Sequence, residues 1–460
     1  KRLRKTKQAA SSFFSVYRSK RGLTMKKKED VVEWIHSFLP FGIKPGLQRM
    51  EALLKELGHP EKKLKAVHVG GTNGKGSTVS FIRHALEEAG YVVGTFTSPY
   101  VECFEERISV NGEPIEAEDL VDCANVIRPL VERLAETELG SPTEFEVITT
   151  IAFYYFAKRS DVDIVLFEVG LGGRYDSTNV ITPLISVITS IGYDHMHILG
   201  SSLEAITREK VGIMKRGVPL VSGVAQREAK AIIQKTAEKM RAPYYQLRDD
   251  FNCELVTVTD QEQRFVYTDA EGKKLECKIR MKGPHQRNNA AVAIQTLQLL
   301  KRCGFSLSDR ALKRGLAKTT WPGRFEIIHE RPLIILDGAH NEQGMTALSE
   351  TLKEIYPERR FHFLIGATKE KEMKTLLKPL ESFDATFTFT SFSFFRAKSA
   401  VALYEEANVE YKSYEENWEK AFANIVTTMN EDDVFVVCGS LYFISEVREK
   451  WNRSPSLLRK

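Results

Sequence analysis

The chain has 460 residues, which favours two or three domains of roughly 100–200 residues each, and no apolar run approaches the about 20 residues that a membrane span needs. The six cysteines are scattered without a C-x-x-C pair, which argues against a disulfide framework or a zinc site and favours a cytoplasmic protein. Of the net charge of +5, residues 1–24 supply eight positive charges and no negative ones, so the remainder carries −3 and no nucleic-acid partner is expected.

Residues 1–24 form the first segment, and their composition differs from that of the rest. They are basic, contain four serines and lack acids, as organellar transit peptides do. We interpret them as a disordered extension translated upstream of Met25 and exclude them from the fold.

The first predicted unit is a strand, a loop, a helix and a second strand. Ala66–Gly70 is a short apolar run that enters a glycine-rich turn. Residues 77–90 have apolar side chains at helical spacing and end at a glycine. Residues 91–97 then favour another strand, so the unit is typical of a parallel sheet.

Strands and helices continue to alternate along the chain. Strands are predicted at 163–169, 184–191 and 218–222, and helices at 145–157, 203–215 and 288–303. Residues 253–279 alternate polar and apolar side chains in places, which favours a small antiparallel addition. After Trp321-Pro322-Gly323, strands are predicted at 333–336, 361–366, 385–390 and 434–438, and helices at 344–355 and 371–380.

The strongest functional signal is the loop 68–78, HVGGTNGKGST, between the first strand and helix. Its backbone N–H groups and the helix N-terminus suit phosphate oxygens, while Lys75 would reach the outer phosphates and Ser77 or Thr78 offers a hydroxyl. A glycine-rich turn without a ligand is the alternative. We therefore predict an α/β fold, with a P-loop-type parallel-sheet ATPase domain over 25–320 and a smaller Rossmann-like domain over 325–460.

Two polar residues follow predicted strands of the first domain. Glu168 sits at the end of the apolar stretch Ile164–Phe167, where an α/β fold opens its ligand crevice, and a carboxylate there needs a cation or a hydrogen-bonding partner. A salt-bridged structural glutamate is the alternative. His195 follows the next strand and a glycine turn, and alone it is more typical of a loop or core residue.

The phosphate loop departs from the usual G-x-x-x-x-G-K-[ST] pattern, because Val69 replaces the first glycine and Gly76 follows the lysine. This variant resembles the phosphate loop of the Mur ligase superfamily. Within that superfamily, a glycine after the lysine resembles the pattern of the folylpolyglutamate synthase and dihydrofolate synthase branch. The resemblance runs from about residue 25 to 448. It includes Thr97-Ser98-Pro99, the segment EVGLGGRYDSTN at 168–179, Asp194-His195, Glu209-Lys210-Val211-Gly212-Ile213, His285-Gln286 with Asn289, Trp321-Pro322-Gly323-Arg324 and Asp337-Gly338-Ala339-His340-Asn341.

The resemblance implies an ATP-dependent ligase. A folate-side carboxylate would attack the γ-phosphate of ATP, and the amine of L-glutamate would then attack the acyl phosphate. The substrates implied are a reduced folate, dihydropteroate, L-glutamate and ATP, with two Mg²⁺ ions, in a monomer. Cationic groups must hold these anions, and Arg107, Arg174 and Arg324 are candidates.

The resemblance also implies residue roles. Lys75, Lys210 and His340 would be catalytic. The ATP site would comprise Thr72, Asn73, Gly74, Lys75, Gly76, Ser77, Thr78, Asn289, Arg324 and Asp337. Magnesium would be held by Ser98, Glu168, His195 and Lys210, the last as a carbamate.

Three questions stay open at this stage. The folate ligase could extend a polyglutamate tail, add the first glutamate to dihydropteroate, or do both. Other classes are a Mur-type ligase of cell-wall precursors, disfavoured by Gly76 and the Ser98-Pro99 motif, and a non-catalytic nucleotide switch. The charge run 369–372, KEKE, predicts a solvated helix start, although it is similar to the family's K-D-K-D segment.

Overall fold

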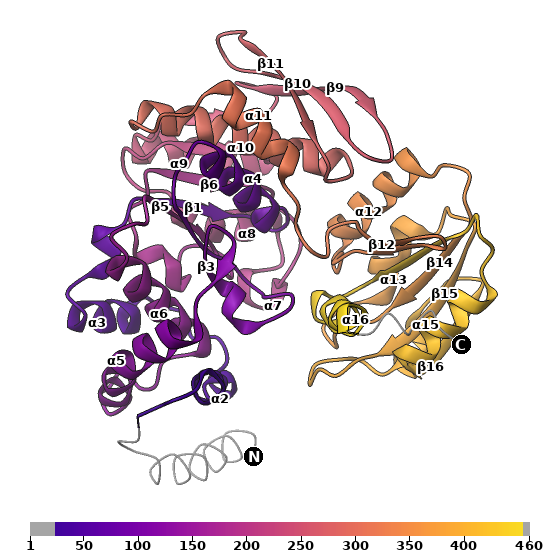
Figure 1. The fold of residues 1–460 in the computed structure, drawn as a ribbon, viewed down its shortest axis with the longest axis horizontal. Coiled ribbons are helices and arrows are strands. Elements are labelled where there is room, and N and C mark those ends of the chain that lie inside the picture. The colour runs from indigo at the N-terminus through magenta and orange to yellow at the C-terminus, as the bar shows by residue number, and fades with distance from the viewer. Residues whose placement is uncertain (1–23, 454–460) are drawn as a thin grey trace.

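The computed structural model describes residues 24–453, which form two lobes, each built on its own sheet (Figure 1). The predicted extension 1–24 falls outside the described residues except for Thr24. Within 24–453, no helix has the length and apolar character needed to cross a membrane. The predicted α/β fold class is confirmed.

The first lobe contains an eight-stranded sheet in the order β4-β3-β2-β5-β1-β6-β7-β8. Strands β2, β5, β1, β6, β7 and β8 run parallel to one another, and β3 and β4 add an antiparallel edge next to β2. Their bounds are β1 Ala66–Gly70, β2 Val93–Phe96, β3 Ile108–Val110, β4 Glu113–Pro114, β5 Ile164–Glu168, β6 Ile185–Ile188, β7 Leu220–Ser222 and β8 Tyr244–Gln246. Parallel order brings the carboxyl ends of β1, β5 and β6 to one edge.

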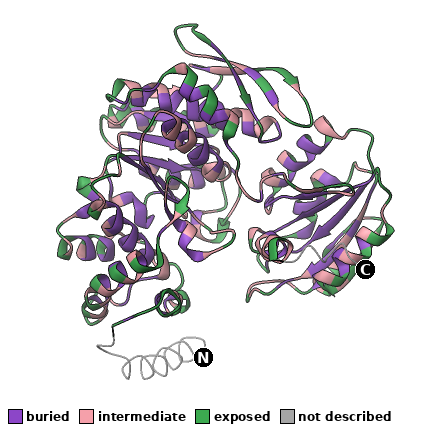
Figure 2. Ribbon diagram, viewed as in Figure 1, coloured by how far each residue is buried: buried purple, intermediate pink, exposed green. Residues whose placement is uncertain are grey.

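Both faces of this sheet are covered, and the strand sequences are apolar for that reason. In β5, Ile164 and Leu166 enter one core, while Val165 and Phe167 enter the other. Since successive side chains of a strand point to opposite faces, a strand buried on both sides needs a continuous apolar run. Figure 2 shows the buried sheet between helices whose outer faces are exposed.

The helices of the first lobe pack around three hydrophobic cores. α4 (Lys75–Glu88), α10 (Pro284–Arg302) and α11 (Asp309–Lys318) pack on one face. The other helices are α2 Lys28–His36, α3 Gln48–Glu56, α5 Ala117–Ala135, α6 Glu144–Lys158, α7 Met196–Leu199, α8 Leu203–Lys210 and α9 Arg227–Met240. The predicted antiparallel addition is a separate three-stranded sheet beside α11, made of β9 Asn252–Val258, β10 Gln263–Thr268 and β11 Lys274–Ile279 (Figure 1).

The second lobe contains a six-stranded sheet in the order β12-β13-β17-β14-β15-β16, in which only the β12–β13 pair is antiparallel. Its strands are β12 Glu326–Glu330, β13 Leu333–Leu336, β14 Phe361–Ile365, β15 Ala385–Ser391, β16 Lys412–Asn417 and β17 Val434–Cys438. α12 Glu342–Ile355, α13 Met373–Leu377 and α14 Ala400–Glu406 share one core, and α15 Trp418–Thr428 and α16 Leu441–Arg453 share the other.

Two predicted helices are shorter than expected. The helix predicted at 203–215 ends at Lys210, and a 3₁₀ turn follows over Val211–Ile213. A Cβ on Gly212 would lie 2.4 Å from the Cα of Arg174, so this segment packs directly on neighbouring backbone. The helix predicted at 371–380 is α13 followed by a 3₁₀ turn over Lys378–Leu380, with proline inside the turn.

Candidate active site

A cleft of about 1130 Å³ lies between the two lobes and is lined by both. The predicted site residues that line it are Thr72, Asn73, Gly74, Lys75, Gly76, Ser77, Ser98, Glu168, His195, Lys210, Asn289, Arg324, Asp337 and His340. Thr78 does not line the cleft. It is fully buried, and its hydroxyl has no hydrogen-bond partner among the described residues.

The phosphate loop joins β1 to α4, which begins at Lys75. Gly74 has a φ of +86°, a conformation that glycine adopts without strain, and the amide of Asn289 lies against it. A Cβ on Gly76 would lie 2.9 Å from two ring carbons of Trp321, in the connector between the lobes. The glycine after the lysine therefore makes room for this indole ring.

The amine of Lys75 is held inside the loop and faces Glu168. Its Nζ donates to the carbonyl oxygens of Gly71 and Thr72, both at 3.3 Å, and lies 3.8 Å from Glu168 Oε1. Burial raises the pKa of Glu168, while Lys75 and the backbone N–H of Ser98, 3.4 Å from Oε2, act in the opposite direction. The end of β5 thus presents a buried carboxylate that gains from a nearby cation.

Lys210 is the most unusual amine of the site. It is 5% exposed, and its Nζ donates to the carbonyl oxygen of Gly71 at 2.9 Å. Within residues 24–453, no carboxylate lies within ion-pairing distance of it. Burial, with a contribution from the charge of Lys75, lowers the pKa of Lys210 to about 7. A large neutral fraction is therefore present near pH 7, which is the form that carbamylation requires.

His195 opens α7 with a φ of +50°. Its Nε2 lies 3.9 Å from Asp194 Oδ1, and the side chain remains 43% exposed in the cleft. Partial burial of the ring, against the opposing effect of Asp194 and with a contribution from Lys371, lowers the pKa of His195 to about 4. The imidazole is therefore neutral at pH 7, which is the form that binds a metal ion.

Arg324 and Asp337 reach the cleft from the second lobe. The guanidinium of Arg324 makes no hydrogen bond or ion pair within the described part of the chain, and a Cβ on Gly338 would lie 2.2 Å from its Nη1. Asp337, at the end of β13, accepts the backbone N–H of Phe325 and of Ala339, both at 2.8 Å. Arg324 is thus a free planar donor suited to phosphate or carboxylate, while Asp337 braces the turn below it.

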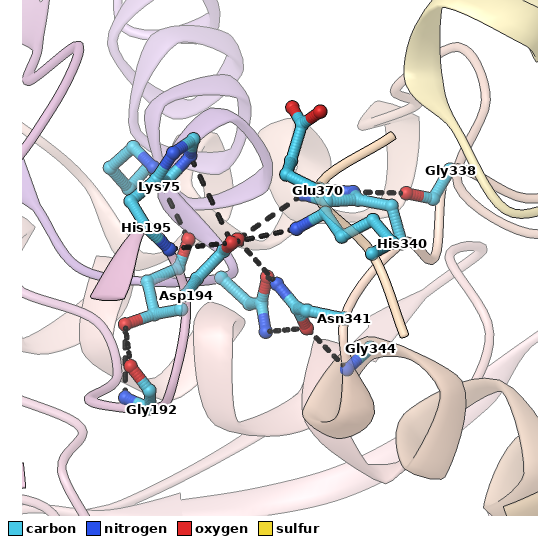
Figure 3. Close-up of polar contacts among 12 residues, drawn as sticks. Lys75, Gly192, Asp194, His195, Gly338, His340, Asn341, Gly344 and Glu370 are labelled. Atoms are coloured by element: carbon cyan, nitrogen blue, oxygen red, sulfur yellow. Dashed lines mark hydrogen bonds and ion pairs between the residues drawn. The ribbon is translucent and has the colours of Figure 1, made fainter. Parts of the chain in front are cut away.

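The two lobes are joined across the cleft at Asp194 (Figure 3). Lys371 Nζ lies 2.7 Å from Asp194 Oδ1, Asn341 Nδ2 donates to Oδ2 at 2.9 Å, and His340 Nε2 lies 3.5 Å from Oδ2. Burial would raise the pKa of Asp194, but His340 and Lys371 outweigh it and hold that pKa far below its usual range. The carboxylate is therefore ionised and paired.

A reciprocal amide pair links the phosphate loop to the second lobe. Asn73 Nδ2 donates to Asn341 Oδ1 at 3.0 Å, and Asn341 Nδ2 donates to Asn73 Oδ1 at 3.1 Å. Asn341 Oδ1 also accepts the backbone N–H of Gly344 and so caps α12. The start of α12 and the phosphate loop are therefore held together by the same side chain.

Comparisons with known proteins agree with this geometry. Residues 69–297 match the family described as Mur ligase middle domain, and residues 323–441 match the Mur ligase, glutamate ligase domain. The dihydrofolate synthase/folylpolyglutamate synthase of Bacillus subtilis (strain 168) is 46% identical over 426 residues, which cover 92% of this chain and 98% of that protein. The chain belongs to the folylpolyglutamate synthase and dihydrofolate synthase family of Mur ligases.

Solved structures of this family have the same fold. A folylpolyglutamate synthase from Thermotoga maritima is 34% identical with a TM-score of 0.80, covering 92% of this chain and 96% of that one. E. coli FolC in complex with DHPP and ADP is 28% identical with a TM-score of 0.83, covering 94% and 99%. As a member of the family, this chain is an ATP-dependent ligase.

Several residues at the centre of the cleft received no role from the sequence. The solvated helix start predicted at 369–372 is wrong for Lys371, whose side chain is 16% exposed and pairs with Asp194. In the sequence, only the motifs Asp194-His195 and Asp337-Gly338-Ala339-His340-Asn341 pointed to this part of the cleft. Of the candidate arginines, Arg107 lines the cleft and pairs with Glu144, whereas Arg174 is exposed and does not line it.

The residues predicted to hold magnesium all line the cleft, but they do not form a complete metal site by themselves. In the described part of the chain, no group of three or more His, Cys, Asp or Glu side chains could hold an ion alone. The structure places Ser98 beside Glu168, while His195 lies beside Asp194. The oxygen atoms of Glu168 and Ser98 suit Mg²⁺, which keeps waters and phosphate oxygens as its other ligands, whereas the imidazole of His195 is an unusual ligand for this ion.

Proposed function

We propose that this ligase adds L-glutamate to the γ-carboxylate of tetrahydrofolate and also adds the first glutamate to dihydropteroate. The observation that carries the proposal is the placement of Lys75 and Arg324, from opposite lobes, in one cleft with Glu168. Such a cleft offers cationic groups to a triphosphate and a carboxylate at the same time. The double activity is supported by the name of the Bacillus subtilis relative.

The reaction proceeds in two transfers. A carboxylate oxygen of the folate attacks the γ-phosphorus of ATP, and ADP leaves. The glutamate amine then attacks the acyl carbon, phosphate leaves, and the nitrogen loses a proton. Lys75 and Arg324 offset the charge that develops on the phosphoryl group, and closure of the lobes excludes water that would hydrolyse the acyl phosphate.

Magnesium belongs to this proposal. Ser98, Glu168 and His195 would hold one ion, and a carbamylated Lys210 would help to hold a second. When bound, Mg²⁺ neutralises negative charge on the triphosphate. Asn289 and Asp337 would contact the nucleotide, and His340 the reacting groups. We further propose that the enzyme is a monomer and that it is cytoplasmic; its free cysteines support the cytoplasmic location alone.

The test is glutamate-dependent ADP release with dihydropteroate, dihydrofolate, tetrahydrofolate or methylenetetrahydrofolate, each offered separately, and mass spectrometry of the products. We expect release with dihydropteroate and with tetrahydrofolate, each product gaining one glutamyl unit. Arg324→Ala should be impaired, whereas Lys235→Ala, an exposed lysine on α9, should not be. A cell-wall nucleotide precursor is offered as a fifth compound, and ADP release with that compound alone would refute the proposal.

A further inference from the structure

The C-terminal helix α16 carries an arginine that contacts both lobes without lining the cleft. Arg448 Nε lies 2.8 Å and 3.0 Å from the two carboxylate oxygens of Glu326 in the second lobe, and its Nη1 pairs with Glu102 of the first lobe. Asn452, one turn further along α16, also donates to Glu102, at 2.9 Å. Figure 1 shows α16 on the side of the second lobe that faces the first. The arginine side chain is only 16% exposed, so one largely buried guanidinium joins a carboxylate from each lobe.

Glu326 holds the turn that carries Arg324. Its Oε2 accepts the backbone N–H of Gly323 at 2.7 Å, and a Cβ on Gly323 would lie 2.5 Å from Ile444 Cδ1 of α16. Within this turn, Gly323 has a φ of +67° and Phe325 a φ of +48°. Left-handed backbone at a residue with a side chain, such as Phe325, persists only where surrounding contacts hold it. The placement of Arg324, between these two residues, therefore depends on the Glu326 carboxylate and on the helix against which the turn packs.

Glu102, the other partner of the arginine, belongs to a first-lobe loop that lines the cleft at Ser98 and Tyr100. The carboxylate of Glu106 accepts three consecutive backbone N–H groups of that loop, over residues 101–103, at 3.0–3.2 Å. Because these hydrogen bonds make the loop a single unit, a shift at Glu102 is passed on to Ser98. Holding Glu102 in place therefore holds this part of the cleft wall in place.

We propose that Arg448 is a positioning residue for the ATP site. By binding Glu326 and Glu102 at once, its guanidinium fixes the turn of Arg324 relative to the first-lobe loop. A guanidinium can do this because it has donors on several nitrogens in a rigid planar fork. The inference rests on the proposed function, in which Arg324 meets the triphosphate. Without Arg448, Arg324 would be in place in only a fraction of the molecules, and the affinity for nucleotide would fall by that fraction.

The test is calorimetric titration of Arg448→Met with the non-hydrolysable ATP analogue AMPPCP, together with measurement of the KM for ATP. We expect the dissociation constant and the KM each to rise about 2- to 30-fold, the range typical of residues that couple to a ligand without contacting it. Arg453→Met removes another arginine of α16, whose partner Glu449 is exposed, and it should leave both constants unchanged. A merely structural role of Arg448 would instead lower the melting temperature and the active fraction, and so reduce kcat with both constants unchanged.

A double-mutant cycle with Glu102→Gln tests the link between the lobes. The Glu102 side chain is 43% exposed and glutamine keeps its size, so this variant retains the fold, and its KM for ATP should also rise. Because the two residues act through one contact, the double mutant should bind AMPPCP no more weakly than Arg448→Met alone.

Effects of the two changes that multiply would overturn the link through Glu102. A wild type that binds AMPPCP and releases ADP with tetrahydrofolate, combined with unchanged constants in Arg448→Met, overturns the positioning role alone. A wild type that does neither overturns the proposed function, and the positioning role with it.

Discussion

Replacing Gly76 by alanine should weaken nucleotide binding through a clash with Trp321. The added Cβ would lie 2.9 Å from two carbons of the indole and 3.0 Å from its nitrogen, inside normal contact distance. Forcing a methyl group into packed surroundings costs about 1–3 kcal/mol. Alanine in a helix gains back about 0.5–1 kcal/mol relative to glycine. The difference spans about 0–2.5 kcal/mol, and because the contact is with a rigid ring we take a net cost of roughly 1–2 kcal/mol.

The ring and the connector are both fixed, so the loop must absorb the shift. Ser80 Oγ, also on α4, donates to the carbonyl oxygen of Thr320 at 2.9 Å, which holds the connector against the helix that begins at the phosphate loop. A displacement of that loop worth 1–2 kcal/mol raises the KM for ATP roughly 5- to 30-fold.

The assay is a double-mutant cycle of Gly76→Ala and Trp321→Leu, with the KM for ATP and the urea unfolding free energy measured for each protein. A smaller residue at 321 removes the obstacle, so the two changes should couple by about 0.5–3 kcal/mol, with the double mutant better than the sum of its parts. Additive effects, or a Gly76→Ala protein that is stabilised with an unchanged KM, would refute the steric reasoning.

Three further predictions concern charges in the cleft. Lys75→Ala should abolish ADP release while far-ultraviolet circular dichroism stays unchanged, and near-normal turnover would reject the phosphate-loop assignment. Glu168→Gln and His195→Ala should each raise the magnesium concentration for half-maximal turnover, so identical titrations would mark them as structural. Lys210→Met should be inactive but more stable than the wild type, because the unfolded lysine binds a proton that the native one, with a pKa of about 7, releases. The free energy of unfolding of the wild type therefore rises from about pH 7 to 10.5. The extra stability of Lys210→Met, on the order of a few kcal/mol below pH 7, should shrink across that window in urea titrations. A difference in stability that stays constant with pH would contradict the lowered pKa of Lys210.

Strand ends were predictable because local sequence determines them. The apolar run before Glu168 is continuous, since both faces of β5 are buried, and the carboxylate must follow where the run stops. α5 escaped prediction: it contains Pro129, which is usually a helix breaker. The environment of Asp194 was also out of reach, because its partner Lys371 is 177 positions away and the charge run around it is typical of solvated surface.

The amide pair between Asn73 and Asn341 makes the phosphate loop and the closed cleft thermodynamically linked. Opening the cleft breaks both hydrogen bonds of the pair at the loop. Linkage is reciprocal: whatever factor closure contributes to nucleotide affinity, bound nucleotide contributes to closure. A substrate that favours closure of the lobes therefore raises the affinity for ATP without contacting it. A product that favours opening lowers the affinity for ADP by the same factor.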